Sequence, residues 1–289
     1  MWNECAIEFV VPSFKNPIPR KVISTMFYDK KTNEWTIIIT RKFREVSGFL
    51  VNTFSEIESS AINWLANQNL PPLYTVGPIL TLKGKKSPNR RNEILKWLDE
   101  QPPSSGIFNK SQSNEIANAL ERNRVRFIWS IRQVPLDSVL PKGFVYRTSG
   151  MGKVMGWVVQ MEILEHPATG GFVSHCGWNS VLESLWNGVA VATWPMYAEQ
   201  QLNTFQMAVE LGVGVEVSLD YSMVGSAEEE LRAEKIDAGI RKLMEGSEEM
   251  KKAVMVKSEE SKKATMEDGS SFNDLNRFID HVFHKINTC

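Results

Sequence analysis

The turn after a short apolar run at residues 171–174 carries side chains that are well suited to bind an anion. The run is expected to be a buried strand, and a helix is expected to begin near Asn179 and Ser180. A helix N-terminus presents unpaired N–H groups and the positive end of the helix dipole, and both favour phosphate. His175 and Asn179 fall in the same turn and could donate hydrogen bonds to a diphosphate. The spacing therefore indicates a phosphate site at the carboxyl end of a strand, where open α/β sheets bind ligands.

Two other interpretations of this turn concern helix capping and nucleophilic chemistry. Asn179 or Ser180 could serve only as an N-cap, because Ser180 and Glu183 have the spacing of a capping box. Cys176 beside His175 could suggest a nucleophilic pair, but successive residues of an extended segment point to opposite sides. Cys176 is therefore interpreted as a small packing residue.

Strands and helices in alternation are expected to position the turn. The regular part of the chain has strand-like apolar runs at residues 126–131, 154–157, 171–174, 189–193 and 214–217. Helical spacing is predicted at residues 113–122, 160–165, 180–187, 199–211, 227–244 and 247–266. Such alternation is typical of a parallel sheet in a doubly wound α/β domain. The glycines near residue 150 lack the spacing of a dinucleotide fingerprint, so nicotinamide binding is disfavoured.

The two ends of the chain are less regular. Residues 1–45 are expected to be irregular, with residues 35–40 left open between a strand and a helical turn. Short strands are predicted at residues 48–53 and 73–77, with a helix at residues 56–67 between them. A last helix follows Gly269, and one stripe of it should dock on an apolar surface. The stripe consists of Phe272, Leu275, Ile279, Val282 and Ile286.

Composition sets the remaining limits. Lys and Arg number 33 against 34 Asp and Glu, so no strong field would draw the chain to nucleic acid or an anionic membrane. Cys5, Cys176 and Cys289 lie far apart with no CxxC pair, which fits a reducing cytosol and no metal site. Glu4 and Glu8 stand where a signal peptide needs basic residues, and no apolar stretch could span a bilayer. We expect a cytoplasmic monomer without membrane insertion.

From Trp157 to Gln200 the sequence resembles the signature box of plant secondary-product glycosyltransferases, over its full length and without a gap. Upstream, Val-Asn-Thr-Phe at 51–54, Val-Gly-Pro at 76–78 and Trp-Leu-Asp-Glu-Gln-Pro at 97–102 are similar to the same family. The matching pieces of the box are Trp157, Gln160, His166-Pro167, residues 170–180, Glu183-Ser184, Gly188, Trp194-Pro195 and Glu199-Gln200.

The resemblance implies a fold and a domain plan. Members of the family have the GT-B architecture, in which two Rossmann-like α/β domains enclose the active site in a cleft. Residues 1–82 would then be a partial N-terminal acceptor domain, and the charged, Gly- and Pro-containing residues 83–92 a linker. Residues 93–270 would form the C-terminal domain that binds the UDP-sugar donor, and residues 271–289 a C-terminal helix.

The resemblance also assigns each matching position to one part of a UDP-sugar. Trp157 would stack on the uracil, Gln160 would contact the base, and Glu183 would bind the ribose hydroxyls. The diphosphate would be held by His175, Asn179 and Ser180. The sugar would be contacted by Trp178, Glu199 and Gln200. Gln200 at the last position is typical of glucose users. Val158-Val159 departs from the usual Ala-Pro of the family and should loosen the loop that holds the base.

The family mechanism is a direct displacement with inversion, in which an N-terminal histidine takes the proton of the acceptor hydroxyl. The histidines of this chain are His166, His175, His281 and His284, and none lies at an early strand end where that base belongs. No catalytic residue is therefore assigned. Residues 103–110 also replace a family strand ending in Phe-Gly-Ser, and the stretch after residue 132 is interpreted as shortened. We expect a chain truncated at its N-terminus and shortened internally.

The expected function is transfer of glucose from UDP-glucose to a hydroxyl of a small flavonoid, phenolic or terpenoid. UDP-sugar would be a substrate, and no cofactor or metal is implied. One alternative is a catalytically inactive remnant that binds UDP-sugar weakly or not at all. Another is a generic α/β domain that acts through protein contacts, which would leave the signature box unexplained.

Overall fold

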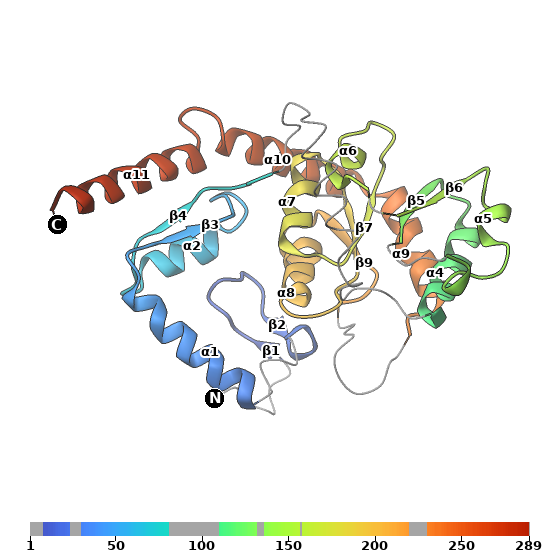
Figure 1. Cartoon of the computed structure of the whole chain (residues 1–289), viewed down its shortest axis with the longest axis horizontal. Helices are drawn as coiled ribbons and strands as arrows, with labels where there is room; N and C mark the ends of the chain where they lie inside the picture. The colour runs from blue at the N-terminus through green and yellow to red at the C-terminus, as the bar shows by residue number, and fades with distance from the viewer. Residues whose placement is uncertain are drawn as a thin grey trace. The chain divides into compact units, whose positions relative to one another are not determined.

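The chain forms two compact units, each of which is described by itself. The computed structural model describes residues 8–23, 30–80, 110–131, 136–156, 158–219 and 230–288 (Figure 1). The first unit comprises Met1–Leu80, Thr169–Ser226 and Gly246–Cys289, and the second comprises Thr81–Ala168 and Ala227–Glu245. The predicted linker at residues 83–92 lies outside the described residues, so the predicted domain limits stay a prediction.

A parallel sheet is the centre of the first unit. Its strands are β7 (Phe172–Ser174), β8 (Val191–Thr193) and β9 (Gly214–Glu216), in that order. All residues of β8 are buried, as expected for the middle strand of a parallel sheet. Ser174 lies opposite Thr193, which lies opposite Glu216, so the carboxyl ends of the three strands are level. The predicted strands and their parallel arrangement are confirmed.

Two helical connections join these strands. Between β7 and β8 runs α7 (Trp178–Trp186), which buries Val181, Leu182 and Leu185. Between β8 and β9 runs α8 (Gln200–Phe205), which continues as the π-helical segment η5 (Gln206–Glu210). In that segment Leu211 N–H donates to the Gln206 carbonyl at 2.9 Å, a contact one residue wider than in an α-helix. The single helix predicted at residues 199–211 is therefore an α-helix with a π-helical end.

The N-terminal segment of the first unit is more regular than the sequence indicated. A short antiparallel pair, β1 (Glu8–Phe9) and β2 (Ile18–Pro19), precedes η1 (Arg20–Val22). Phe9, Ile18 and Val22 share a buried cluster with Phe205 of α8 and with Leu219. Next come α1 (Lys30–Lys42) and η3 (Phe43–Glu45). For the described residues the expectation of an irregular segment is wrong, because apolar residues on both sides of the prolines pack on α8, and residues 35–40 are helical.

A second, smaller parallel sheet carries the chain's C-terminal helix. β3 (Phe49–Val51) and β4 (Leu73–Thr75) pair in parallel around α2 (Ser59–Ala66), close to the predicted ranges. Against β4 lies α11 (Ser270–Thr288) (Figure 1). The Tyr74 ring lies 5.5 Å from that of Phe278, and both Thr75 N–H and Oγ1 donate to Asp274, at 2.8 and 2.9 Å.

The apolar stripe predicted on α11 is not the face that docks on β4. Its residues are 38–65% exposed: Phe272, Leu275, Ile279, Val282 and Ile286. The docking face is offset from the stripe by one residue toward the N-terminus of the helix and includes Asp274, Phe278 and His281. The prediction of a docked stripe is therefore wrong for the described residues. The polar atoms of Tyr74 and Thr75 on β4 need hydrogen-bonding partners, and the face with Asp274 and His281 supplies them.

The helix before α11 packs on α7. It is α10 (Glu248–Ala264), and its N-cap Ser247 accepts a hydrogen bond from Met250 N–H at 3.1 Å. Ser258 on its buried face donates to the Trp186 carbonyl at 2.9 Å, which satisfies a carbonyl in the last turn of α7. The helix predicted at residues 247–266 is confirmed.

The second unit has its own parallel strand pair, β5 (Phe127–Ser130) and β6 (Gly152–Met155). Its helices are α4 (Lys110–Asn123), η4 (Leu136–Ser138), α5 (Phe144–Arg147), α6 (Gln160–Leu164) and α9 (Ala233–Glu245). Phe144 packs its ring 6.1 Å from Phe127 and 5.9 Å from Trp129. Residues 93–109, with nearly all of the segment interpreted as replacing a family strand, lie outside the described residues. No helix in the described part of the chain is long and apolar enough to span a membrane.

Candidate functional site

The turn between β7 and α7 is built on a buried cysteine with a left-handed backbone. Cys176 has a φ of 60° and is fully buried. Its N–H donates to Ser174 Oγ at 3.0 Å, and its carbonyl accepts from Asn203 Nδ2 at 2.9 Å. Burial raises the pKa of the Cys176 thiol to about 11, so the thiol is protonated at neutral pH and is a poor nucleophile. The interpretation of Cys176 as a packing residue is confirmed.

The first turn of α7 begins without a side-chain cap. Its N-cap is Gly177, and Trp178 is the first helical residue. Asn179 and Ser180 are therefore the second and third residues of the helix, so the interpretation of Ser180 and Glu183 as a capping box is wrong. The start of α7 at Trp178 could not be predicted from the sequence, because a glycine N-cap has no side chain that would mark it. The N-terminal end of α7 lies at the carboxyl end of β7, where its dipole favours an anion.

The second titratable side chain of this turn is His175. Burial of the ring lowers the pKa of His175, while the nearby Glu199 carboxylate acts in the opposite direction. The imidazole is therefore mostly neutral at pH 7, with one nitrogen as donor and the other as acceptor. Gly177 leaves the space that the ring fills, because a Cβ on Gly177 would lie 2.6 Å from His175 Nε2.

The connection from β8 to α8 brings a second group of predicted residues to the same sheet edge. β8 lies beside β7 in the same direction, so residues 194–200 follow the strand end next to the His175 turn. Gln200 is 3% exposed, and its Oε1 accepts from Met196 N–H at 2.9 Å and from Tyr197 N–H at 3.2 Å. Glu199 is exposed and close enough to influence the pKa of His175.

Residues after β3 contact the first turn of α7. Trp178 Nε1 donates to the Asn52 carbonyl at 2.8 Å, and Asn52 Nδ2 donates to Asn179 Oδ1 at 3.2 Å. The indole N–H is the only polar group of a tryptophan side chain, so Trp178 could reach a ligand only through its ring or its backbone. Sequence reasoning did not place Asn52 in the site. The Val-Asn-Thr-Phe stretch, similar to the family, was the available signal.

The predicted site residues thus fall into three groups. Those in the two connections or in the helices that follow them in the first unit are His175, Trp178, Asn179, Ser180, Glu183, Glu199 and Gln200. Gln160 is the first residue of α6 in the second unit and is half-buried. Trp157 lies outside the described residues. In the described part of the chain, no cluster of three or more His, Cys, Asp or Glu residues could hold a metal ion.

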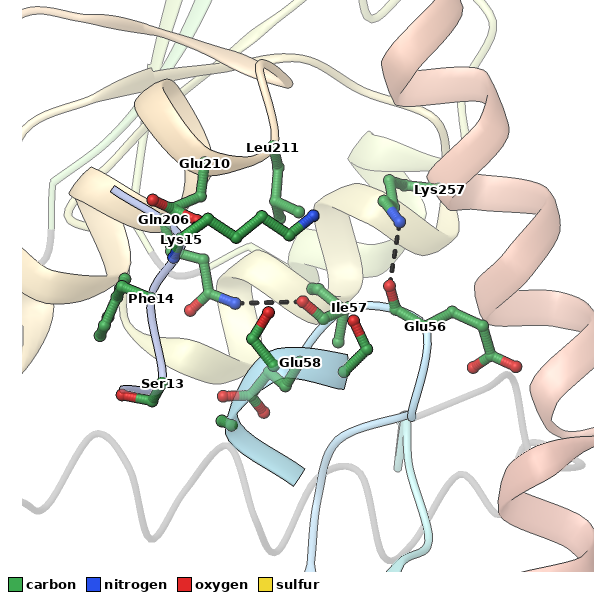
Figure 2. A pocket seen from close by; sticks show the side chains of 13 residues that line it. Ser13, Phe14, Lys15, Glu56, Ile57, Glu58, Gln206, Glu210, Leu211 and Lys257 are labelled. Carbon is green, nitrogen blue, oxygen red and sulfur yellow. Dashed lines mark hydrogen bonds between the residues drawn. The ribbon is translucent and has the colours of Figure 1, made fainter. Parts of the chain in front are cut away.

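A separate pocket of about 160 Å³ lies in the first unit between the segment at residues 13–15, the start of α2 and η5. Figure 2 shows two hydrogen bonds at its wall: Gln206 Nε2 to the Ile57 carbonyl at 3.3 Å and Lys257 Nζ to the Glu56 carbonyl at 3.0 Å. Burial raises the pKa of Glu58 in this wall. The residues lining the pocket include none of the predicted UDP-sugar residues.

Comparison with known proteins decides the family. The family model described as UDP-glucoronosyl and UDP-glucosyl transferase matches residues 105–266, which is more than half of the chain. The chain belongs to this UDP-glycosyltransferase family. It is 46% identical over 298 residues to UDP-glycosyltransferase 71A15 of Malus domestica, covering 95% of this chain and 63% of that protein. It is 47% identical over 294 residues to anthocyanidin 3-O-glucosyltransferase 2 of Manihot esculenta, a match that covers 94% of this chain and 83% of that protein.

Solved UDP-glycosyltransferases share the fold. A transferase from Siraitia grosvenorii in complex with UDP is 51% identical, with a TM-score of 0.82, and the match covers 96% of this chain and 69% of that one. Medicago truncatula UGT71G1 complexed with UDP-glucose is 38% identical, with a TM-score of 0.83, and the match covers 96% of this chain and 64% of that one. The fold is therefore the GT-B-like α/β fold of plant UDP-glycosyltransferases, as predicted. The chain spans about 63% of the length of the first two curated relatives.

Proposed function

We propose that the β7–α7 turn binds the diphosphate of a UDP-sugar. The observation that carries the proposal is the N-terminus of α7, which begins at a glycine N-cap with His175 and Asn179 beside it. Backbone N–H groups and the helix dipole favour a diphosphate, and the two side chains can each donate a hydrogen bond to it. Ser180, the third helical residue, would complete the contacts.

Within the first unit, the sugar of the donor would lie along the same sheet edge. Gln200 uses its amide oxygen on the backbone of the loop, which leaves its amide nitrogen to donate to a sugar hydroxyl. The exposed Glu199 carboxylate can accept from sugar hydroxyls, and Trp178 would contribute its backbone or ring. Glu183 would bind the ribose, and Trp157 and Gln160 the uracil, as in the family. Gln200 at this position favours glucose as the sugar.

The proposed reaction is transfer of glucose from UDP-glucose to a hydroxyl of a small plant metabolite, with inversion. The acceptor oxygen would form a bond to the anomeric carbon while the bond to the UDP oxygen breaks and UDP leaves. The hydroxyl proton passes to a general base that we assign to no residue of this chain. Relatives named for glucosylation of flavonoids and anthocyanidins support the class of acceptor.

A specific observation favours a second function, donor binding without transfer. His166 Nδ1 accepts from Ala168 N–H at 3.2 Å, and His281 Nδ1 pairs with the Tyr74 hydroxyl at 2.6 Å. Both contacts are structural, His284 lies exposed on α11, and His175 belongs to the proposed diphosphate turn. Turnover of UDP-glucose with a panel of phenolic acceptors separates the two functions. Robust glucoside formation by this chain would refute donor binding without transfer.

Calorimetry with UDP tests the donor site itself. We expect wild type to bind UDP, His175→Ala and Trp157→Ala to bind more weakly, and the control His166→Ala to bind like wild type. His166 is a matched control because it is an exposed histidine of the signature box without a proposed ligand contact. Equal affinities for all four proteins would refute the donor site.

We further propose that the protein acts as a monomer in the reducing cytosol. The wide separation of Cys5, Cys176 and Cys289 in the sequence supports the compartment. Size-exclusion chromatography with light scattering checks the oligomeric state, and a dimer mass would contradict it.

A further inference from the structure

Asn52, the residue directly after β3, contacts two residues of the proposed donor site. Its carbonyl accepts from Trp178 Nε1 at 2.8 Å, and its Nδ2 donates to Asn179 Oδ1 at 3.2 Å. These partners are more than a hundred residues away in the sequence. Asn52 therefore joins the β3–β4 layer to the first turn of α7, within the first unit.

A third contact fixes which end of the Asn52 amide faces α7. Asn52 Oδ1 accepts from Ile79 N–H at 2.7 Å. A backbone N–H can only donate, so the atom that it meets must be the amide oxygen. The other end of Asn52 is then the NH₂ group, which can only donate, so it must meet the oxygen of Asn179. The Ile79 N–H thus fixes the orientation of the Asn52 amide, and the Asn52 amide in turn fixes that of Asn179.

Gly77 allows the close approach on which this series depends. A Cβ on Gly77 would lie 2.5 Å from Asn52 Oδ1 and 2.7 Å from Thr53 N. Only a glycine lets the chain after β4 pass near enough for Ile79 N–H to reach the amide. The Gly77 carbonyl accepts from Ser271 Oγ of α11, which ties this segment in place. The Asn52 amide is therefore held from one side by the backbone that follows β4.

The orientation leaves the NH₂ group of Asn179 as its available end. Within the described residues, the bond from Asn52 is the side-chain hydrogen bond that Asn179 makes. A diphosphate accepts hydrogen bonds, so an NH₂ group turned toward it binds, while an amide oxygen in its place would repel. We propose that Asn52 is a positioning residue of the donor site, which holds the Asn179 amide with its NH₂ group toward the diphosphate. This inference rests on the proposed donor site.

Asn52→Asp is the sharpest single test of this role. The substitution keeps the size of the side chain and an oxygen that accepts from Ile79 N–H. It also keeps the backbone carbonyl that accepts the hydrogen bond from Trp178 Nε1. It replaces only the NH₂ group, so the Asn179 amide gains by flipping its own NH₂ group toward the new carboxylate. We expect the affinity for UDP to fall about 5- to 10-fold, the equivalent of one hydrogen bond.

A double-mutant cycle separates positioning from charge repulsion or a damaged fold. UDP affinity is measured by calorimetry for wild type, Asn52→Asp, Asn179→Ala and the double variant, with thermal unfolding as the check of folding. If Asn52 acts through Asn179, Asn52→Asp changes the affinity by less than about 2-fold once Asn179 is alanine. Asn52→Ala, which adds no charge, carries the same cycle if Asn52→Asp does not fold.

Each outcome decides the inference. A loss of affinity in the wild-type background that disappears in the Asn179→Ala background supports it. An equal loss in both backgrounds overturns it, because the effect would then not pass through Asn179. Wild-type affinity in a folded Asn52→Asp variant, together with a loss in His175→Ala, overturns this inference alone. No UDP binding by wild type overturns the donor site and the inference together.

Discussion

Gly177→Ala should weaken UDP binding without destabilising the protein. Gly177 has a φ of −60° and a ψ of 140°, which alanine adopts without strain. Alanine has fewer unfolded conformations than glycine, which favours the fold by about 0.4–1 kcal/mol, but it is a poorer N-cap residue by a similar amount, so we expect little net change in stability. The added Cβ, however, would lie 2.6 Å from His175 Nε2, 3.3 Å from its Cδ2 and 3.4 Å from its Cε1.

The size of the effect follows from the movement of the ring. Ordinary contact between these atoms needs about 3.4 Å or more, so Nε2 must retreat by roughly 1 Å. A hydrogen bond of about 2.9 Å to phosphate would then be stretched beyond its useful range. Hydrogen bonds to charged groups contribute about 1.5–3 kcal/mol, and the ring can adjust in part, so we expect the lower figure. UDP affinity should fall about 10-fold.

Calorimetry with UDP and thermal unfolding of the same preparations check this prediction. The control is Gly177→Ala in the His175→Ala background, where the added methyl group has no ring to displace and should change the affinity little. The reasoning is refuted if Gly177→Ala binds UDP as wild type does. It is also refuted if the loss persists without the imidazole, because the methyl group would then act directly on the ligand.

Three further predictions concern pH, a buried amide and a strained backbone. Because the pKa of His175 is lowered, the ring gains its proton only in mild acid. A bound diphosphate favours the protonated ring, so the affinity of wild type for UDP should rise as pH falls. His175→Gln, which has no imidazole, should lack this rise. Calorimetry from about pH 8 to pH 5 measures the difference, and parallel curves for the two proteins would contradict it. The ligand-free protein should lose stability over the same fall, because its unfolded chain takes up the proton more readily. Gln112→Leu should lower the free energy of unfolding by about 2–4 kcal/mol. Gln112 is 1% exposed, its Oε1 accepts from Leu231 N–H at 2.8 Å, and its Nε2 donates to the Leu231 carbonyl at 2.9 Å. Urea unfolding measures this, with the exposed Ser111→Ala as control, and equal midpoints would refute it. Arg124, with a φ of 58° just after α4, should be better replaced by glycine, so Arg124→Gly should stabilise by about 0.5–1 kcal/mol, whereas Arg126→Gly in the extended chain should not. Thermal unfolding compares them, and a lower midpoint for Arg124→Gly would refute the reasoning.

Local patterns in the sequence predicted the elements around β7, β8 and β9 to within a few residues. Short apolar runs separated by amphipathic segments leave few alternatives to a parallel sheet. The exact start of α7 was missed, because Gly177 caps it without a side chain. The π-helical end of α8 was missed as well, since its ladder shift has no clear sequence signal.

Long-range contacts could not be predicted. The pattern on α11 identified a helix but gave the wrong docking face, because the polar atoms of Tyr74 and Thr75 decide which side packs on β4. In the candidate site, helix geometry and residue type placed His175 and Asn179 in one turn. Asn52 escaped notice because its role depends on a tertiary contact that no spacing rule connects to α7.

A structure of this chain with UDP tests the central claim most directly. We expect the diphosphate at the N-terminus of α7, within hydrogen-bonding distance of the His175 ring and the Asn179 NH₂ group. Asn52 should keep its bond to Asn179 Oδ1 in that complex. A diphosphate bound elsewhere, for instance in the pocket beside Glu58 and Lys257, or no bound UDP at saturating concentration, would contradict it.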